Sequence, residues 1–508
     1  MSLKSRASGV LMPISCLPGD YGIGTLGKDA RRFVDLLQTM GFTYWQILPI
    51  GPIDACFSPY KSTSAFAGNP LLIDLDILNQ WGLLTADEII SCKSLAPPYS
   101  IDYPNLINNR DTIFKLAFSR LTTDFSNEIN QYSLANHDWL ADFALYTVLC
   151  EQFSENDWTK WKNADLVKHT PAAIAAAITA YQDAIDYQIF LQYVYNRQWI
   201  DFKNYANSKG IKIIGDMPIY IAHTSADVWC HPELFQLDEN GIPINVAGVP
   251  PDYFSETGQL WGNPLYRWDV MKKNNYRWWL RRIQKSFADF DTVRIDHFRA
   301  FSAYWSVPAT APTAKSGNWI PGPARDFFKQ LEKSFPAANI IAEDLGFQDP
   351  ELIKLLSNTG FPGMRIMEFA FIDKLNNIHL PHNYTANMVA YSGTHDNNTL
   401  LGTFFEYSPE QRRYAFNYCG YCEAWENQWQ IGGYQSPSCR AFIRTLFQSV
   451  ANLVMLPIQD LCGYGSDTRI NKPGTTENNW IFRMTREELS NIDTDWFNQL
   501  NHLYRRIE

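Results

Sequence analysis

Eight short runs of apolar, mostly branched residues recur along the chain, and each run ends in polar residues or glycine. The stretches between the runs carry apolar residues at helical spacing, as in 28–41, 325–335 and 350–360. Buried strands that alternate with amphipathic helices are typical of a parallel sheet covered by helices, and eight such units favour a closed barrel. We therefore expect an α/β fold of the (β/α)8 TIM-barrel type. Its strands are expected within 9–15, 44–50, 211–222, 291–298, 339–346, 363–371, 387–396 and 452–460.

The spacing of these runs is uneven, which predicts two insertions into a single catalytic barrel domain over residues 1–508. Residues 51–210, between the second and third strands, are mostly helical in pattern. Residues 223–290 contain "VAGVPPDYFSETGQLWGNP" (246–264), which is rich in proline, glycine and aromatic residues and is expected to form a long ordered active-site loop. Barrel enzymes build their sites at the carboxyl ends of the strands, so both insertions are expected on that rim.

Composition and charge narrow the range of partners. The formal net charge is −10 and no basic block occurs, so nucleic acid is not expected to bind. No stretch reaches the roughly 18 apolar residues of a membrane span, and the N-terminus lacks the apolar core of a secretion signal. Nine scattered cysteines fit a reducing compartment, so we expect a cytoplasmic location.

"CGYC" at 419–422 lacks the buried strand that precedes a thioredoxin-type redox pair, and we expect a structural role for Cys419 and Cys422.

Carboxylates stand at or near the ends of four predicted strands. They are Asp216, Asp296, Glu343 and Asp396. One such residue is usually a turn former or a helix cap. The carboxyl ends of barrel strands all open on the same mouth, however, so four carboxylates on separate strands predict a functional site there.

Two chemistries suit such a set of carboxylates: binding of a divalent cation, or glycosyl transfer with one acid and one nucleophile. Arg294 lies two residues before Asp296, so the two side chains leave the same face of the strand. The cation should keep that carboxylate ionised and works against a nearby metal ion. Glu343 lies in the apolar stretch "IIAEDLG", which should raise its pKa and suit it as a general acid. We therefore expect no metal and no cofactor, with a metal-dependent barrel hydrolase as an alternative.

Aromatic residues make up 15% of the chain. They fit either a large aromatic core or a surface that stacks on sugar rings.

Long motifs surround these residues, including "VRIDHFRAF" (293–301), "AEDLG" (342–346) and "GTHDNNT" (393–399). "GVLMPISCLPGDYGIGTLG", "SPYKSTSAFAGNPLLIDL", "GDMPIYIA", "GVPPDYFSETGQLWGNPLY" and "NKPGTTENNW" accompany them in the same chain. Together they resemble the 4-α-glucanotransferases, also called amylomaltases or disproportionating enzymes, which form glycoside hydrolase family 77 of the α-amylase superfamily. The resemblance runs over essentially the whole chain. It implies a barrel without the C-terminal β-sandwich domain of most amylases.

The resemblance also implies roles for individual residues. Asp296 resembles the nucleophile, Glu343 the general acid/base, and Asp396 the carboxylate that steadies the distorted donor sugar. The implied substrate-binding residues are Arg294, His395 and Asp216 in the donor subsite, Tyr60 stacked on the sugar at the scission point, Tyr253, Phe254 and Trp261 on the acceptor side, and Asn471.

The implied activity is transfer of part of an α-1,4-glucan, such as maltose, a maltooligosaccharide or amylose, to the 4-hydroxyl of another glucan or of glucose. The reaction would proceed with retention through a covalent glycosyl-enzyme. Two alternatives use the same scaffold: an α-1,4-glucan hydrolase of the α-amylase superfamily, and a non-catalytic glucan-binding barrel.

Overall fold

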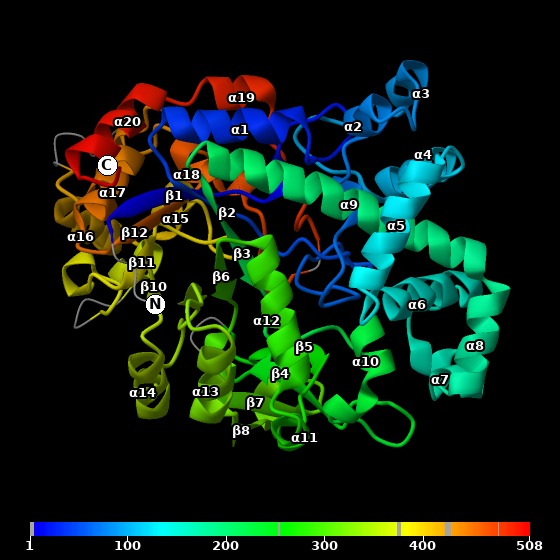
Figure 1. Cartoon of the computed structure of the whole chain (residues 1–508). Coiled ribbons are helices and arrows are strands. Elements are labelled where there is room, and N and C mark those ends of the chain that lie inside the picture. The colour runs from blue at the N-terminus through cyan, green and yellow to red at the C-terminus, as the bar shows by residue number, and fades with distance from the viewer. Residues whose placement is uncertain (1–4, 252–254, 373–376, 422–427, 476, 508) are drawn as a thin grey trace.

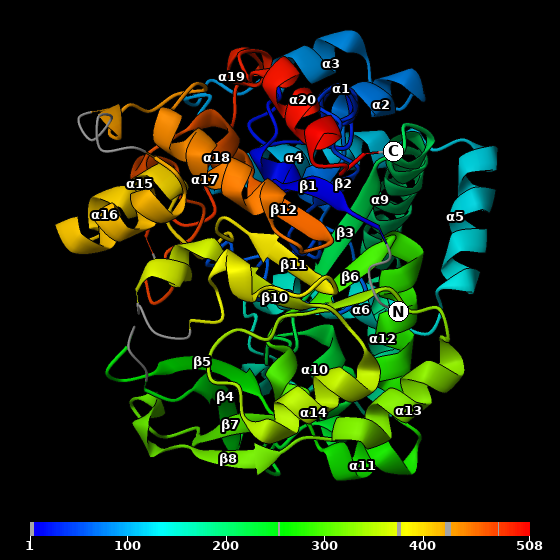
Figure 2. The same ribbon diagram turned by 90° about the vertical axis from the view of Figure 1, so that its left-hand side faces the viewer.

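The computed structural model of the protein describes residues 5–251, 255–372, 377–421, 428–475 and 477–507. Eight parallel strands form its central sheet in the order β10-β11-β12-β1-β2-β3-β6-β9 (Figures 1 and 2). Each strand overlaps one of the eight runs expected from the sequence. Their bounds are β1 Ala7–Leu11, β2 Tyr44–Gln46, β3 Lys212–Met217, β6 Thr292–Ile295, β9 Ile340–Ala342, β10 Gly363–Ile366, β11 Met388–Tyr391 and β12 Leu453–Pro457.

The two strands at the ends of this order, β9 and β10, lie next to each other and close the barrel. The amide of Ala342 donates to the carbonyl of Pro362 at 2.9 Å. Asp344 adds a second link, because its Oδ1 accepts from the amide of Met364 at 2.7 Å and its Oδ2 lies 3.1 Å from Nη1 of Arg365. The predicted (β/α)8 barrel is therefore confirmed.

Helices cover the outside of the barrel, and seven of them follow the expected alternation with the strands. They are α1 Lys28–Thr39, α9 Gln182–Ser208, α12 Arg277–Asp289, α13 Ala324–Ser334, α14 Pro350–Thr359, α17 Pro437–Gln448 and α20 Thr494–Leu503. Between β10 and β11 the described residues form only short 3-10 turns, at Met367–Phe371 and Pro381–Asn383.

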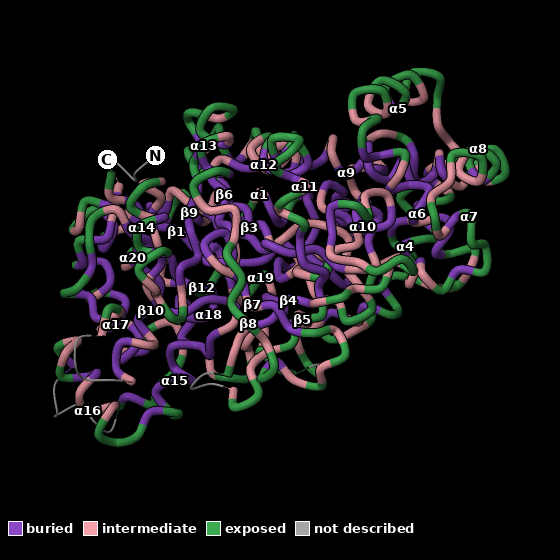
Figure 3. Tube along the Cα trace, turned by 90° about the horizontal axis from the view of Figure 1, so that it is seen from below, coloured by how far each residue is buried: buried purple, intermediate pink, exposed green. Residues whose placement is uncertain are grey.

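Outward-facing side chains of the strands pack against these helices. Trp45 on β2 is fully buried and meets Phe33 of α1 and Phe202 of α9 edge-on, with ring centroids 4.7 and 5.6 Å apart. Its indole N–H donates to the carbonyl of Met12 at 2.8 Å, so the polar edge of the ring is satisfied as well. The strands of the central sheet are mostly buried, whereas helices such as α5 (Thr123–Ala135) and α8 (Pro171–Ala180) show long exposed stretches (Figure 3).

The segment between β2 and β3 is helical and leads into the long helix α9. Helices α4, α5, α6 and α8 pack against α9 and lie to one side of the barrel (Figure 1). The bounds not yet given are α2 Leu75–Gln80, α3 Ala86–Ser91, α4 Tyr103–Phe118, α6 Leu140–Phe153 and α7 Ala164–Val167.

A second, antiparallel sheet lies beside the barrel, in the order β5-β4-β7-β8 (Figure 2). Its strands are β4 Asn245–Val249, β5 Gln259–Pro264, β7 Ala303–Pro308 and β8 Asn318–Pro321. The expected loop at 246–264 is thus mostly a β-hairpin, which corrects the prediction. Glycine in both strands and proline in β5 hide the pattern. The pairing of β4 with β7 also joins residues about 60 apart in the sequence, which no local pattern reports.

The remaining helices complete the rim and the C-terminal region. Their bounds are α10 Ala226–Cys230, α11 Trp268–Lys273, α15 Leu400–Glu406, α16 Pro409–Tyr418, α18 Ile458–Cys462 and α19 Arg486–Ser490.

Cys419 directly follows α16, and burial raises the pKa of its thiol. Cys422 lies outside the described residues. Among the helices that the structure describes, none has the length and apolar character needed to cross a bilayer. The cytoplasmic location stays a prediction.

Candidate active site

A buried guanidinium joins two of the predicted carboxylates. Asp216 on β3 and Arg294 on β6 are register partners in neighbouring strands. Nη1 of Arg294 lies 2.7 Å from both carboxylate oxygens of Asp216, and its Nη2 lies 3.0 Å from Oδ1 of Asp296. Its Nε contacts the sulfur of Met364 at 3.4 Å. One arginine thus fixes two carboxylates at the carboxyl ends of adjacent strands.

Asp296 and Glu343 meet at this mouth through the backbone. Asp296 directly follows β6, Glu343 directly follows β9, and the amide of Glu343 donates to the carbonyl of Ile295 at 3.1 Å. The peptide N–H of His297, next to Asp296, donates to Oε2 of Glu343 at 2.7 Å. Oε1 of Glu343 accepts from the amide of Leu345 at 2.8 Å. The Glu343 carboxyl is therefore held at both oxygens beside Asp296.

The electrostatics of this pair favour two different protonation states. Burial and the adjacent Asp296 carboxylate raise the pKa of Glu343 to about 7. Burial also raises the pKa of Asp296 to about 6, although Arg294 acts in the opposite direction. The expectation that Arg294 keeps Asp296 ionised therefore left out the opposing effect of burial. The guanidinium beside Asp296 favours its charged form, whereas the neighbouring carboxylate of Asp296 favours the protonated form of Glu343.

Asp396 stands on the opposite side of the mouth with two polar partners. Its Oδ1 accepts from Nδ2 of Asn471 at 2.6 Å, and its Oδ2 lies 3.3 Å from Nε2 of His395. Burial works against its charge, but His395 and Asn471 together lower the pKa of Asp396 to about 2. In turn Asp396 raises the pKa of His395 despite the burial of that ring. The carboxylate is 45% exposed, so an ionised acid faces the open mouth.

Tyr60 links the two halves of the site. Its hydroxyl donates to Oδ2 of Asp216 at 2.7 Å and lies 3.5 Å from Nδ1 of His395. Its ring stacks on the His395 ring, with centroids 5.0 Å apart and planes 17° apart. The ring of Trp480 belongs to the same cluster. Its centroid lies 5.8 Å from that of Tyr60 and 6.0 Å from that of His395. His395 therefore covers one face of the Tyr60 ring.

The small antiparallel sheet reaches the site through Trp261 on β5. The Trp261 ring meets the ring of His297 edge-on at 4.8 Å, directly beside Asp296. The segment of the second insertion therefore borders the acid pair. Tyr253 and Phe254, expected on the same side, lie outside the described residues.

Comparison with known proteins decides the family. A family model described as 4-alpha-glucanotransferase matches residues 12–489. A 4-alpha-glucanotransferase of Streptococcus pneumoniae is 41% identical over 507 residues, which cover 99% of this chain and 98% of the relative. That of Thermus thermophilus is 41% identical and covers 96% of both chains. The amylomaltase of Streptococcus agalactiae, solved in complex with acarbose, superposes with a TM-score of 0.95 at 38% identity and covers 99% of this chain and all of that one.

The chain belongs to the 4-alpha-glucanotransferase family. It is an enzyme of the amylomaltase type, and α-1,4-glucans are the substrates of that type. The residues expected from the 4-alpha-glucanotransferase motifs converge on one mouth, with the two exceptions that lie outside the described residues. The structure joins Asp216, Arg294 and Asp296, and places Glu343 beside them. His395, Asp396 and Asn471 form a second group that Tyr60 links to Asp216, and Trp261 lies at the edge.

Several residues of this 4-alpha-glucanotransferase site were not singled out from the sequence. Trp480 is the last residue of the motif "NKPGTTENNW", but nothing in the sequence marked it as a residue of the site. Its left-handed φ of 67° is known only from the structure. Arg469 donates to the carbonyls of Asp396 and Asn471 and so holds their loops together. His297 contributes its amide rather than its ring, which no sequence pattern reports.

Removing the central guanidinium should destabilise the fold much more than removing a surface one. Arg294→Leu leaves Asp216 and Asp296 without their cation, and the free energy of unfolding is expected to fall by about 3–5 kcal/mol. Arg31→Leu, which breaks an ion pair with Asp201 at the surface, serves as the matched control, with an expected loss of about 0–1 kcal/mol. Urea unfolding at pH 7 measures both. Equal losses in the two variants would contradict a central role for Arg294.

Proposed function

We propose that this chain transfers a segment of an α-1,4-glucan to the 4-hydroxyl of another glucan or of glucose, by a retaining double displacement. The observation that carries the mechanism is the pair Asp296 and Glu343, which are linked through the His297 amide and differ in pKa. Retaining enzymes need one carboxylate and one carboxylic acid on opposite sides of a glycosidic bond.

In the first half-reaction the carboxylate of Asp296 attacks the anomeric carbon of the donor. The bond from that carbon to the glycosidic oxygen breaks, and Glu343 gives its proton to the departing oxygen. The reducing-end fragment leaves, and a β-linked glycosyl-enzyme remains on Asp296. For this step the two carboxyl groups are expected about 5–5.5 Å apart.

In the second half-reaction Glu343 acts as a base. It takes the proton from the 4-hydroxyl of the acceptor while that oxygen attacks the anomeric carbon and displaces Asp296. The new bond is again α-1,4, and Glu343 regains the proton for the next cycle. The amides of His297 and Leu345 hold Glu343 in one position for both proton transfers.

The partners of the pair prepare the donor subsite. We assign to Asp396 the binding of the distorted donor sugar, because its low pKa keeps it ionised at the mouth. His395 and Asn471 orient that carboxylate, and Arg294 orients Asp296. Tyr60 offers its free ring face to the sugar while Asp216 fixes its hydroxyl.

Transfer requires that the glycosyl-enzyme react with a sugar rather than with water. A bound hydroxyl gains a high effective concentration when the cleft positions it and excludes loosely held water. Trp261 is placed for this task, because it lies against the turn that carries Asp296 and His297. We assign the acceptor side to the β4–β5 hairpin for this reason.

Maltotriose distinguishes transfer from hydrolysis and tests the nucleophile. The protein is expected to yield longer oligomers and glucose, and Asp296→Asn should lower turnover by a factor on the order of 10⁴ or more while the protein still folds. Asp201→Asn, a surface change of the same kind, should leave turnover unchanged. Product analysis and circular dichroism measure these outcomes. Products that are only shorter than maltotriose would support a hydrolase, and a sugar trapped on a residue other than Asp296 would refute the assignment.

The pH profile should reflect the two carboxyl groups. The first step needs Asp296 ionised and Glu343 protonated, so kcat/KM should rise with pH through about 6 and fall above about 7. The control is a maltosyl fluoride, whose fluoride leaves without a proton, and its profile should keep the acidic limb and lose the alkaline one. An alkaline limb that persists with the fluoride would show that Glu343 is not the acid.

Removing the Trp261 ring should change how often the glycosyl-enzyme reacts with water instead of a sugar. Trp261→Ala opens the cleft beside His297, and the ratio of hydrolysis to transfer is expected to rise about tenfold, because water then competes with a less well-placed acceptor. Leu260→Ala is the matched control, since Leu260 is the neighbouring residue on β5, is exposed, and points to the other face of the strand. Glucose release and chain rearrangement are measured on the same substrate. An unchanged ratio would remove the hairpin from the transfer step.

A further inference from the structure

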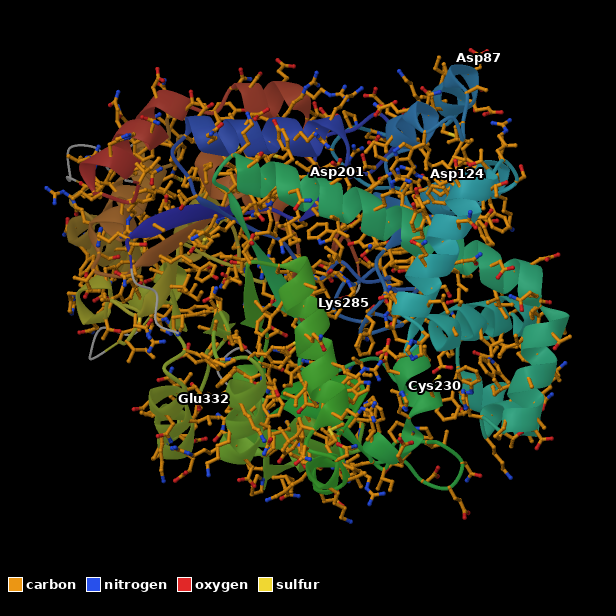
Figure 4. All side chains as sticks on the ribbon, in the orientation of Figure 1. Asp87, Asp124, Asp201, Cys230, Lys285 and Glu332 are labelled. Carbon is orange, nitrogen blue, oxygen red and sulfur yellow. The ribbon has the colours of Figure 1, made fainter. Side chains whose placement is uncertain are left out.

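Three potential metal ligands converge away from the barrel mouth. They are Asp142 in the first turn of α6, His169 just after α7, and Cys230, the last residue of α10. One donor atom from each lies within 4.8 Å of the other two. Among the described residues this is the group that could share a metal ion. Cys230 lies on α10, which packs against α6 (Figures 1 and 4).

The surrounding residues hold this cluster in place. Trp229, the neighbour of Cys230, is fully buried, and its indole N–H donates to the carbonyl of Leu166 on α7 at 2.8 Å. The ring of His169 meets the ring of Trp229 edge-on at 4.5 Å. Trp229 therefore brings His169 and Cys230 together from two distant parts of the sequence. The contacts of Trp229 with Leu166 and His169 therefore hold the cluster together.

The His169 ring has an unused donor or acceptor atom. Its Nε2 is buried and has no hydrogen-bond partner among the described residues. Leaving such an atom unsatisfied costs about 1–3 kcal/mol, so natural structures usually provide a partner. A neutral imidazole nitrogen offers the lone pair that a metal ion needs.

A small cavity adjoins two of the three ligands. Its volume is about 20 Å³, and its lining includes Asp142, Cys230 and His231. This is room for one water molecule. A water in this cavity would lie beside Asp142 and Cys230.

We propose that Asp142, His169 and Cys230 bind one Zn²⁺ ion, with water as the fourth ligand. Sulfur and imidazole donors favour Zn²⁺ over Mg²⁺ or Ca²⁺, which prefer oxygen ligands. With bonds of about 2.0–2.3 Å, ligand atoms around a tetrahedral zinc lie about 3.3–3.8 Å apart, so the side chains close in by about 1 Å. The thiol of Cys230 releases its proton to solvent as the Zn–S bond forms.

The ion would join two parts of the rim. Asp142 and His169 belong to the helical segment between β2 and β3, whereas Cys230 belongs to the segment that follows β3. A metal bridge between them would stabilise the packing of α6 and α7 on α10. It lies outside the site of glucan transfer, so it is expected to affect stability more than chemistry.

Zinc binding to the full-length protein tests this proposal. The protein is stripped with a chelator, and added Zn²⁺ is titrated in competition with a chromophoric chelator. We expect one tight site per chain. Loss of one ligand in Cys230→Ser or His169→Gln should weaken binding at least ~100-fold, more than the loss of a group that only supports a ligand. In the wild type, Zn²⁺ should also raise the Tm, because the assembled site binds the ion more tightly than the unfolded chain does.

Matched substitutions outside the cluster separate this site from general effects. Cys92→Ser and His502→Gln remove the same donor types elsewhere and should bind Zn²⁺ as tightly as the wild type. Co²⁺ should give a thiolate charge-transfer band in the wild type and none in Cys230→Ser. Asp142→Asn keeps the shape of the side chain and provides a variant that should fold if the other two do not. Failure of the wild type to bind Zn²⁺, or equal affinity in the cluster and control variants, would overturn the proposal.

Discussion

The site of this enzyme depends on one buried arginine. Arg294 carries its charge into the barrel, where water cannot stabilise it, so it needs carboxylate partners at short range. Asp216 supplies both oxygens at 2.7 Å from the neighbouring strand, and Asp296 supplies a third at 3.0 Å. Because Asp216 and Arg294 are register partners, a slip of β3 against β6 would separate the charges. The same ion pairs therefore fix the sheet register and position Asp296.

The three carboxyl groups Asp296, Glu343 and Asp396 have different surroundings, so they favour different protonation states. Asp296 faces a cation, whereas Glu343 is held by the amides of His297 and Leu345 and faces the charge of Asp296. Asp396 lies at the exposed edge with Asn471 and stays ionised. The backbone at His297 adopts a left-handed φ of 49°, which is uncommon for a residue other than glycine. This backbone conformation points the peptide N–H of His297 toward Glu343. A strained residue therefore lies directly beside the acid pair.

The strands of the barrel position the carboxylates of the site, and the inserted segments surround them. Tyr60 enters from the segment after β2 and Trp261 from the hairpin after β3, and both contact histidines that directly adjoin carboxylates of the site. This division explains how a common scaffold becomes specific for a polymer. Strand ends fix the reacting groups within the rigid sheet, while loops and the small sheet shape the channel around a sugar chain.

The sequence by itself determined the eight strands and the barrel, because each buried strand is a local apolar run. Its continuous motifs also contain the carboxylates that the structure brings together at the mouth. Only the tertiary structure decided what depends on contacts between distant segments. The β4–β5 hairpin pairs with β7, Trp480 joins Tyr60, and the amide of His297 meets Glu343, and none of these is encoded in a short stretch. The pKa of Asp296 also belongs to this second group, since burial outweighs the neighbouring Arg294 and burial is a property of the whole fold.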